Sequence, residues 1–185
     1  MDINIREATP DDVGALVDLV RACLDGMRNQ GIDQWDDVYP DRATIERDVA
    51  GATAFVATVD SSVLGMAVLN EHQEREYAEV PWRFAGRTMV IHRLMVAPSA
   101  EGKGVARALM LHLETRGEAV GFDCVRLDAF SGNARAVRFY ERAKYRLAGH
   151  VRFRKGDFHC FEKQLGALAN PPLNGKTLEL RERTQ

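Results

Sequence analysis

The sequence predicts an α/β domain in which a mixed sheet of about seven strands carries about four helices on its two faces. Three observations predict this class. Helical and strand-like periodicities alternate along the chain. The run Thr88–Val96 is apolar on both alternating faces, as in a central strand that is covered on two sides. The chain has 185 residues, 45% of them hydrophobic, which suits one domain with a sizeable core.

The N-terminal part predicts one strand and two helices. Residues 2–7 are strand-like, and Thr9 can cap a following helix in which Pro10 suits the first position. Apolar residues then recur at helical spacing and form one stripe that ends before Gly31. Asp41 can cap a short second helix that continues to residue 49.

Two β-rich runs, residues 52–58 and 63–69, predict a hairpin that turns at residues 60–62. The stretch from residue 70 to 87 is long, charged and irregular. Long irregular connections in compact domains are often functional, so we expect this segment to contribute to a site.

The C-terminal part continues with alternating helices and strands. Pro98 ends the central strand, and Asn133 can cap the last helix. The patterns predict a helix over 102–116, a strand over 123–129, a helix over 133–143, and a closing hairpin of strands 145–153 and 158–165 with its turn near 155–157. We assign residues 1–165 to the domain and expect 166–185 to be a peripheral or partly disordered extension.

Composition argues against several classes of protein. The chain has 25 Lys and Arg against 27 Asp and Glu, so a nucleic-acid partner is not expected. Its three cysteines are far apart and lack metal-binding spacing, which argues against a zinc site or a disulfide framework. No export signal and no apolar run of roughly 20 residues occurs, so we expect a cytoplasmic protein without a membrane partner.

The segment after the central strand is typical of a phosphate-binding turn. A buried strand end is followed by a glycine-containing turn and a helix start, where free amide groups and the helix dipole favour an anion. The P-loop and dinucleotide motifs both fail here, and the glycines alone favour a simple turn over a phosphate site. The candidate cofactor-binding residues are Leu94, Met95, Val96, Glu101, Gly102, Lys103, Gly104, Val105, Ala106 and Arg107.

A second pattern lies at the start of the last helix. Asn133 and Tyr140 are seven residues apart and share one helix face, about 10 Å from end to end. A tyrosine hydroxyl on an otherwise apolar face needs a partner. Tyr140 is therefore either a tyrosine at the edge of the core that bonds a backbone carbonyl, or a residue that acts on a ligand.

Together the two stretches resemble the GNAT superfamily of N-acetyltransferases. Residues 94–96 and 101–106 follow its first motif, Q/R-x-x-G-x-G/A after a strand that ends L-x-V. Asn133, Ala136, Tyr140 and Glu141 follow its later motif, N-x-x-A-x-x-x-Y-E. Glu101 departs from the usual glutamine or arginine, and Lys144-Tyr145 departs from the usual glycine-aromatic pair.

The resemblance implies a twisted, mostly antiparallel sheet and a direct attack of an amine on the thioester of acetyl-CoA. It also implies that Asn133 helps to bind acetyl-CoA and that Tyr140 protonates the departing thiolate. Backbone N–H groups near Met95 and Val96 are expected to stabilise the carbonyl oxygen.

The general base is less clearly indicated. By strand alternation, His92 is expected on the same face as Leu94 and Val96, and a histidine suits proton acceptance at neutral pH. A satisfied buried histidine is the plainer interpretation. Glu71 and His72 are rival bases that could act through water, although residues in such places are more often plain surface residues.

We expect Trp35, Tyr39, Glu71 and Trp82 to contact the acceptor, the aromatic rings by cation–π contact with an amine. Hydrophobic plugs beneath loops are an equal alternative for the aromatic residues.

Two rival functions remain open at this level: a non-catalytic acyl-CoA-binding module on the same fold, and another transferase or nucleotide-binding enzyme. A small-molecule amine is favoured as acceptor over a protein N-terminus, and a homodimer is the default expectation.

Overall fold

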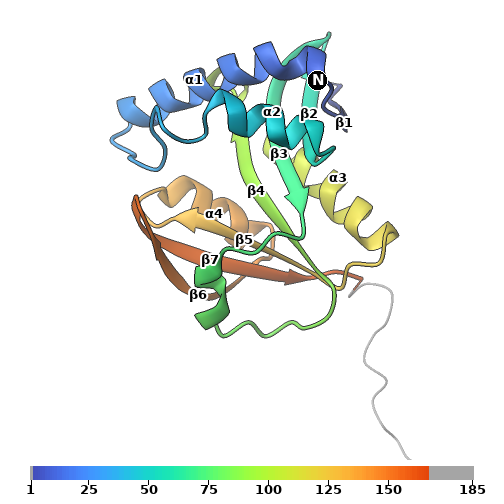
Figure 1. The fold of residues 1–185 in the computed structure, drawn as a ribbon, viewed down its shortest axis with the longest axis vertical. Helices are drawn as coiled ribbons and strands as arrows, with labels where there is room; N and C mark the ends of the chain where they lie inside the picture. Colours follow the sequence, from blue (N-terminus) through green and yellow to red (C-terminus); the bar gives the residue numbers. More distant parts are fainter. Residues whose placement is uncertain (1, 167–185) are drawn as a thin grey trace, which may run out of the picture.

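Seven strands form one mixed sheet in the computed structural model, which describes residues 2–166 (Figure 1). The sheet has the order β1-β2-β3-β4-β5-β7-β6, and β4–β5 is its one parallel pair. The strands are β1 (Asn4–Glu7), β2 (Ala54–Val59), β3 (Ser62–Asn70), β4 (Thr88–Val96), β5 (Cys124–Phe130), β6 (Arg146–Phe153) and β7 (Gly156–Gln164). The predicted mixed, mostly antiparallel sheet is confirmed.

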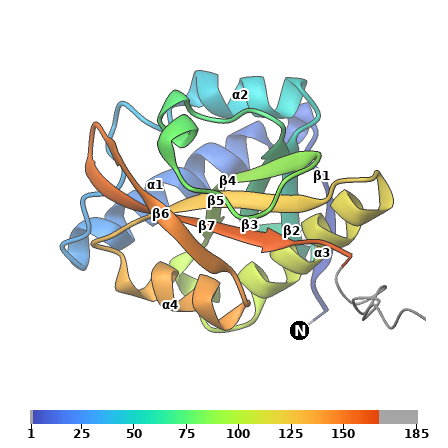
Figure 2. The same cartoon turned by 90° about the horizontal axis from the view of Figure 1, so that it is seen from below.

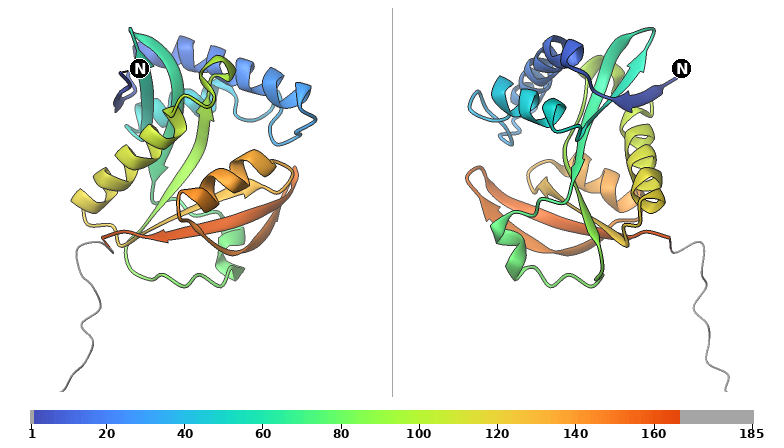
Figure 3. Two further views of the ribbon diagram at one scale, coloured as in Figure 1. Left: turned by 180° about the vertical axis from the view of Figure 1, so that it is seen from behind. Right: turned by 45° about the vertical axis from the view of Figure 1, so that its right-hand side comes forward.

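Helices cover both faces of this sheet. The four helices of the described residues are α1 (Val13–Asn29), α2 (Arg42–Ala50), α3 (Val105–Ala119) and α4 (Ala134–Arg142). α1 and α2 lie on one face of β2–β4, and α3 lies on the other (Figure 3). α4 lies alongside β5 and the final hairpin (Figure 2). The central strand β4 is therefore covered on two sides, as its sequence predicts.

The two parallel strands β4 and β5 separate soon after they begin. Thr88–Val90 pairs with Cys124–Arg126, and no further register joins the two strands. Beyond this point they diverge, and β4 keeps only β3 as its partner (Figure 1). The divergence leaves backbone groups at the end of β4 free to bind a ligand.

A β-bulge lies in β4 next to this divergence. Met66 pairs with Met95 and Val68 with His92, so Arg93 and Leu94 together face one residue of β3. Arg93 adopts the left-handed φ of 50° and is held there by Asp48, with nitrogen–oxygen distances of 2.7 and 2.6 Å.

The bulge corrects one prediction about side-chain direction. Leu94 and Val96 pack against the α3 side of the sheet, together with Ile91. His92 alternates with Ile91 and therefore points to the opposite face. Strand alternation placed His92 with Leu94, which is wrong because the extra residue of the bulge reverses the alternation between them.

Local signals placed most element boundaries within two residues. The caps at Asp41 and Asn133 are confirmed, since their side chains accept from the backbone N–H groups of Thr44 and Ala136. α3 begins at Val105, three residues later than predicted, because Gly102 and Gly104 have φ of 72° and 88°, outside helical geometry.

The remaining differences lie in turns and in the irregular segment. The final hairpin turns at residues 154–155. Arg75–Glu79 forms a 3-10 helix, η2, inside the segment predicted to be irregular. The extension beyond residue 166 lies outside the described residues. Within residues 2–166, no helix combines the length and apolarity that crossing a membrane requires.

Candidate functional site

A cleft of about 770 Å³ lies where β4 and β5 diverge. Its walls come from α1, the segment after α1, the end of β4, the turn before α3, β5 and α4. The structure brings nearly all predicted cofactor-binding residues into this one cleft: Leu94, Met95, Val96, Glu101, Gly102, Gly104, Val105, Ala106, Arg107, Asn133 and Tyr140. Lys103 lies in the same turn but is not a lining residue.

The turn before α3 presents a set of unpaired amide groups. Among the described residues, no acceptor pairs with the backbone N–H groups of Gly102, Gly104, Val105, Ala106 and Arg107. A side-chain carbon at Gly102 or Gly104 would meet no atom within 4 Å, so both glycines border open space. Converging N–H donors at a helix N-terminus fit a diphosphate, so the donor set matches the one that coenzyme A requires.

The substitution Gly104→Ala tests this phosphate site. The added carbon would stand where the ligand approaches, and the backbone at φ 88° disfavours alanine. Because losing one charge-assisted hydrogen bond costs about 1.5–3 kcal/mol, we expect the Kd for acetyl-CoA to rise about 10- to 100-fold by calorimetry.

The matched control is Gly121→Ala. Gly121 follows α3, has φ of 85° and also borders open space, but it does not line the cleft. This control should lose similar stability and bind acetyl-CoA normally. Unchanged binding by Gly104→Ala would contradict the assignment of the phosphate site.

Charges around the turn compensate the unusual Glu101. Its carboxylate forms an ion pair with Arg135 of α4, across the cleft wall. Arg107, Arg138 and Arg142 also line the cleft. The positive side chains outnumber the carboxylate, so the surroundings of the amide groups suit an anion.

Asn133 and Tyr140 both lie on the cleft side of α4. The Asn133 side chain caps α4 and donates to Oε1 of Gln34 at 3.1 Å, which ties α4 to the segment after α1. Tyr140 is 7% exposed and packs edge-on against Phe139 and Tyr145. Burial raises the pKa of the Tyr140 phenol above its usual value, and nearby Asp128 raises it further. The phenol is therefore protonated at neutral pH.

Asp128 is a cleft residue that the sequence analysis missed. It lies on β5 with its side chain opposite to the core residues Leu127 and Ala129, and it is partly exposed to the cleft. Burial raises the pKa of its carboxyl to about 6. An aspartate inside the predicted strand CVRLDAF was the available signal, since buried acids in strands need a reason. A carboxylate with such a pKa suits proton acceptance near neutral pH.

A backbone donor at the end of β4 also faces the cleft. Ala97 N–H pairs with Leu64 of β3, and N–H directions alternate along a strand. Val96 N–H therefore points away from β3, while Met95 N–H points toward it. The Val96 carbonyl, on the cleft side, accepts from Sγ of Cys23 at 3.3 Å. Of the two predicted oxyanion donors, the geometry favours Val96.

The structure places the predicted base candidates away from the cleft lining. Nε2 of His92 lies 3.1 Å from Oδ1 of Asn70 and 3.2 Å from the carbonyl of His72, so that nitrogen carries the proton. Burial lowers the pKa of His92 to about 4, which leaves the ring neutral and weakly basic. Glu71 is exposed and pairs with Arg87 at 2.6 Å, and His72 is exposed.

The predicted acceptor aromatics divide into two groups. Trp35 lines the cleft. Tyr39 lies outside the lining, and its hydroxyl accepts from Arg93 at 2.6 Å. Trp82 packs beneath its loop, edge-on to Tyr77 and 4.4 Å from the guanidinium of Arg126. Trp82 therefore fits the alternative of a hydrophobic plug beneath a loop better than a contact with the acceptor. No group of metal-ligating side chains occurs in residues 2–166.

Comparisons with known proteins identify the family of the chain. The model of the acetyltransferase (GNAT) family matches residues 20–145. An amino-acid acetyltransferase of Ralstonia nicotianae is 31% identical over 118 residues, which are 63% of this chain and 21% of that protein. The chain thus spans about a fifth of the length of that relative.

Solved structures show the same fold. A GNAT-family acetyltransferase of Streptococcus agalactiae superposes with a TM-score of 0.78 at 23% identity, over 88% of this chain and 95% of that one. The PaiA N-acetyltransferase of Thermoplasma acidophilum, in complex with coenzyme A, superposes with a TM-score of 0.69 at 18% identity, over 89% and 99%. With the matched family model and the shared fold, the chain belongs to the acetyltransferase (GNAT) family.

Proposed function

We propose that this protein is an N-acetyltransferase that moves the acetyl group of acetyl-CoA to a primary amine by direct attack. One observation carries the proposal: a single cleft combines unpaired amide groups with a carboxylate, Asp128, and a protonated phenol, Tyr140. The amides at residues 102–107 would hold the diphosphate, and acetyl-CoA would supply the activated acyl group.

Each step then has a residue in place. Asp128 accepts the proton that an ammonium acceptor must lose, so that the amine nitrogen can bond to the carbonyl carbon. Val96 N–H donates to the carbonyl oxygen as negative charge develops. Tyr140 gives its proton to the sulfur as the carbon–sulfur bond breaks. The nitrogen loses two protons in all: Asp128 takes the first and passes it to solvent, and the second leaves as the amide forms. Through solvent this second proton replaces the one that Tyr140 gave to sulfur, so each turnover releases one proton.

Direct attack is favoured over an acetyl-enzyme because the cleft lacks a reactive thiol. Cys23 supplies the one thiol among the lining residues that the structure describes. Burial raises the pKa of the Cys23 thiol to about 11, and the thiol donates to Val96. A thiol, unlike a thiolate, is a poor nucleophile.

The substitution Cys23→Ala should therefore leave kcat within about threefold of the wild-type value, because only a weak neutral hydrogen bond is lost. Initial rates and intact-mass spectra of both proteins with acetyl-CoA would check this. An acetyl adduct on wild-type Cys23, together with loss of turnover in the variant, would contradict direct attack.

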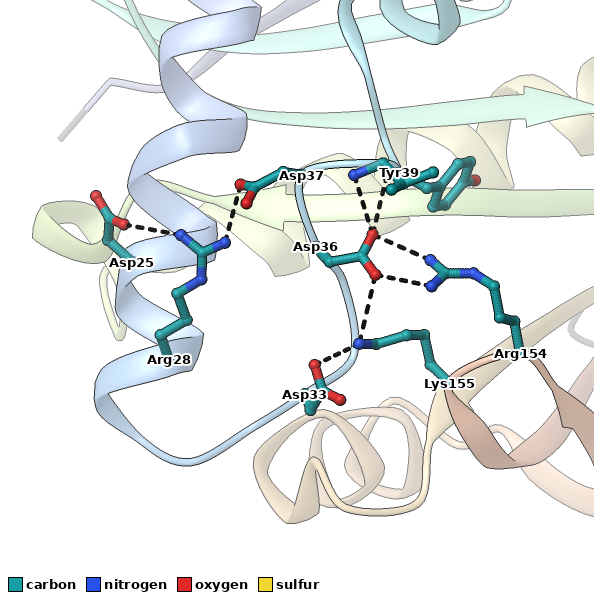
Figure 4. A network of polar contacts seen from close by, with 9 residues as sticks. Asp25, Arg28, Asp33, Asp36, Asp37, Tyr39, Arg154 and Lys155 are labelled. Carbon is teal, nitrogen blue, oxygen red and sulfur yellow. Dashed lines mark hydrogen bonds and ion pairs between the residues drawn. The ribbon is translucent and has the colours of Figure 1, made fainter.

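We propose a small amine as acceptor because the cleft is bounded by a fixed segment. The segment of residues 31–40, which we call the strap, is tied to the turn between β6 and β7 (Figure 4). Asp36 accepts two hydrogen bonds from Arg154, at 2.8 and 3.0 Å, and Lys155 pairs with both Asp33 and Asp36. Trp35 of the same strap lines the cleft. A tied strap restricts the approach more for an extended chain than for a small molecule.

The proposal is tested by following free-thiol release from acetyl-CoA with a panel of small amines, amino acids and N-terminal peptides. We expect amine-dependent release, fastest with a small amine. Calorimetric binding of acetyl-CoA without turnover on any acceptor would instead favour a non-catalytic acyl-CoA-binding module. Stabilisation by ATP in place of acetyl-CoA would contradict the proposal.

A further inference from the structure

Asp128 accepts a hydrogen bond from Tyr77, a residue that does not line the cleft. The hydroxyl of Tyr77 donates to Oδ2 of Asp128 at 2.7 Å. Tyr77 is 2% exposed, lies in η2 and is absent from the cleft lining. Within the described residues this is the one hydrogen bond that the Asp128 carboxylate receives, so Oδ1 has no protein partner there.

The position of the Tyr77 phenol is fixed by its surroundings. Trp82 packs on the Tyr77 ring with centroids 5.2 Å apart, and its indole N–H donates to the Tyr77 carbonyl at 2.9 Å. Further along the segment, the backbone N–H groups of Arg83 and Phe84 donate to the buried carboxylate of Glu162 on β7, at 3.0 and 3.1 Å. These contacts anchor the long connection between β3 and β4, and they place the Tyr77 hydroxyl against Asp128.

Among residues 2–166, no cation faces the Asp128 carboxylate. Five titratable groups lie around it: Glu74 just before η2, Tyr77 of η2, Cys160 at the paired position of β7, Tyr140 of α4, and Tyr39 of the strap. Arg126 precedes it on the same strand face, but its guanidinium is engaged with Gln73 and with the carbonyl of Phe84. The Tyr77 hydroxyl is thus the group in this set that favours the ionised carboxylate, while burial and Glu74 oppose ionisation.

We propose that Tyr77 is a positioning residue of the acetyl transfer: its hydroxyl holds Oδ2 of Asp128 so that Oδ1 faces the acceptor amine. The proposal rests on the proposed function, in which Asp128 takes the proton of the amine. It explains why a phenol is buried inside an otherwise irregular segment. It also assigns a role to the connection between β3 and β4, which contributes no residue to the cleft lining.

The variant Tyr77→Phe tests the proposal, because it keeps the ring and removes the hydrogen bond. Loss of a donor raises the pKa of a carboxyl. The acid limb of kcat/KM, expected near pH 6 in the wild type, should therefore move up by about one pH unit. On the plateau kcat should fall by up to about tenfold while the Kd for acetyl-CoA stays unchanged.

Tyr145→Phe is the matched control. The Tyr145 hydroxyl also donates to a carboxylate, Glu114, at 2.8 Å, and Tyr145 is also buried, but neither residue lines the cleft. Both variants should lose comparable stability in thermal unfolding. Only Tyr77→Phe should move the acid limb.

A carbon-13 NMR titration of the Asp128 carboxyl, assigned by its loss in Asp128→Asn, separates this proposal from the proposed function. In the full chain without substrates, the Asp128 pKa should be higher in Tyr77→Phe than in wild type or Tyr145→Phe. If it is higher but no amine is acetylated, the positioning role in catalysis fails with the proposed function, while the hydrogen bond itself is confirmed. If transfer occurs and neither the titration nor the acid limb moves, Tyr77 is only structural and the proposal is overturned.

Discussion

Replacing Tyr140 by phenylalanine should lower kcat by about 10²–10⁴-fold, the usual contribution of a positioned general acid. The phenol is protonated at neutral pH and lines the cleft, so its removal leaves the departing thiolate without a proton donor. The ring packing against Tyr145 and Phe161 is retained, and binding of acetyl-CoA should therefore persist. Steady-state rates and calorimetric binding would be measured side by side.

The Tyr145→Phe variant again serves as control, since it removes a neighbouring buried hydroxyl outside the cleft. Its kcat should stay close to the wild-type value. If Tyr140→Phe turns over as fast as this control, Tyr140 is a core residue and the proton comes from elsewhere.

Asp128→Asn should lower kcat/KM by a comparable factor, about 10²–10⁴-fold at neutral pH. The amide keeps the size of the side chain but cannot accept a proton. In the wild type, the carboxyl has its pKa raised to about 6 and is ionised above that pH, so activity should fall as pH drops below 6. The variant should lack this limb. Its residual rate should rise toward high pH, where a free amine with a pKa of about 10.4 no longer needs a base.

His92 is the rival base, and His92→Gln separates the two hypotheses. The pKa of His92 is lowered to about 4, and its side chain bonds Asn70 outside the cleft lining. We expect the Asp128 variant to lose far more activity. The reverse order, with an intact acid limb in Asp128→Asn, would assign the base to His92.

Much of the fold could be predicted because its signals are local. The bounds of β4 follow directly from one apolar run, and the caps at Asp41 and Asn133 follow from single residues next to helical patterns. The glycine-containing turn and the position of Tyr140 in the cleft could be predicted for the same reason. Each lies in a short segment whose residue types favour a particular backbone conformation, a turn or the start of a helix.

The missed features depend on contacts between distant segments. The bulge at Arg93 exists only in the register of β4 against β3, so alternation within one strand placed His92 on the wrong face. Asp128 becomes a cleft residue only because β5 leaves β4 after three paired positions. Tyr77 reaches it from a segment without periodicity. The pattern of residues within one strand or helix does not predict contacts between segments that are distant in the sequence.

The central claim is that amide groups at the start of α3 hold the diphosphate of acetyl-CoA and aim its thioester at Tyr140, in the cleft that Asp128 also lines. A crystal structure of the protein with coenzyme A measures this most directly. We expect phosphate oxygens within about 3 Å of the amides of residues 102–107, and the sulfur within hydrogen-bond reach of the Tyr140 hydroxyl. A diphosphate bound elsewhere, or a sulfur that points away from Tyr140, would contradict it.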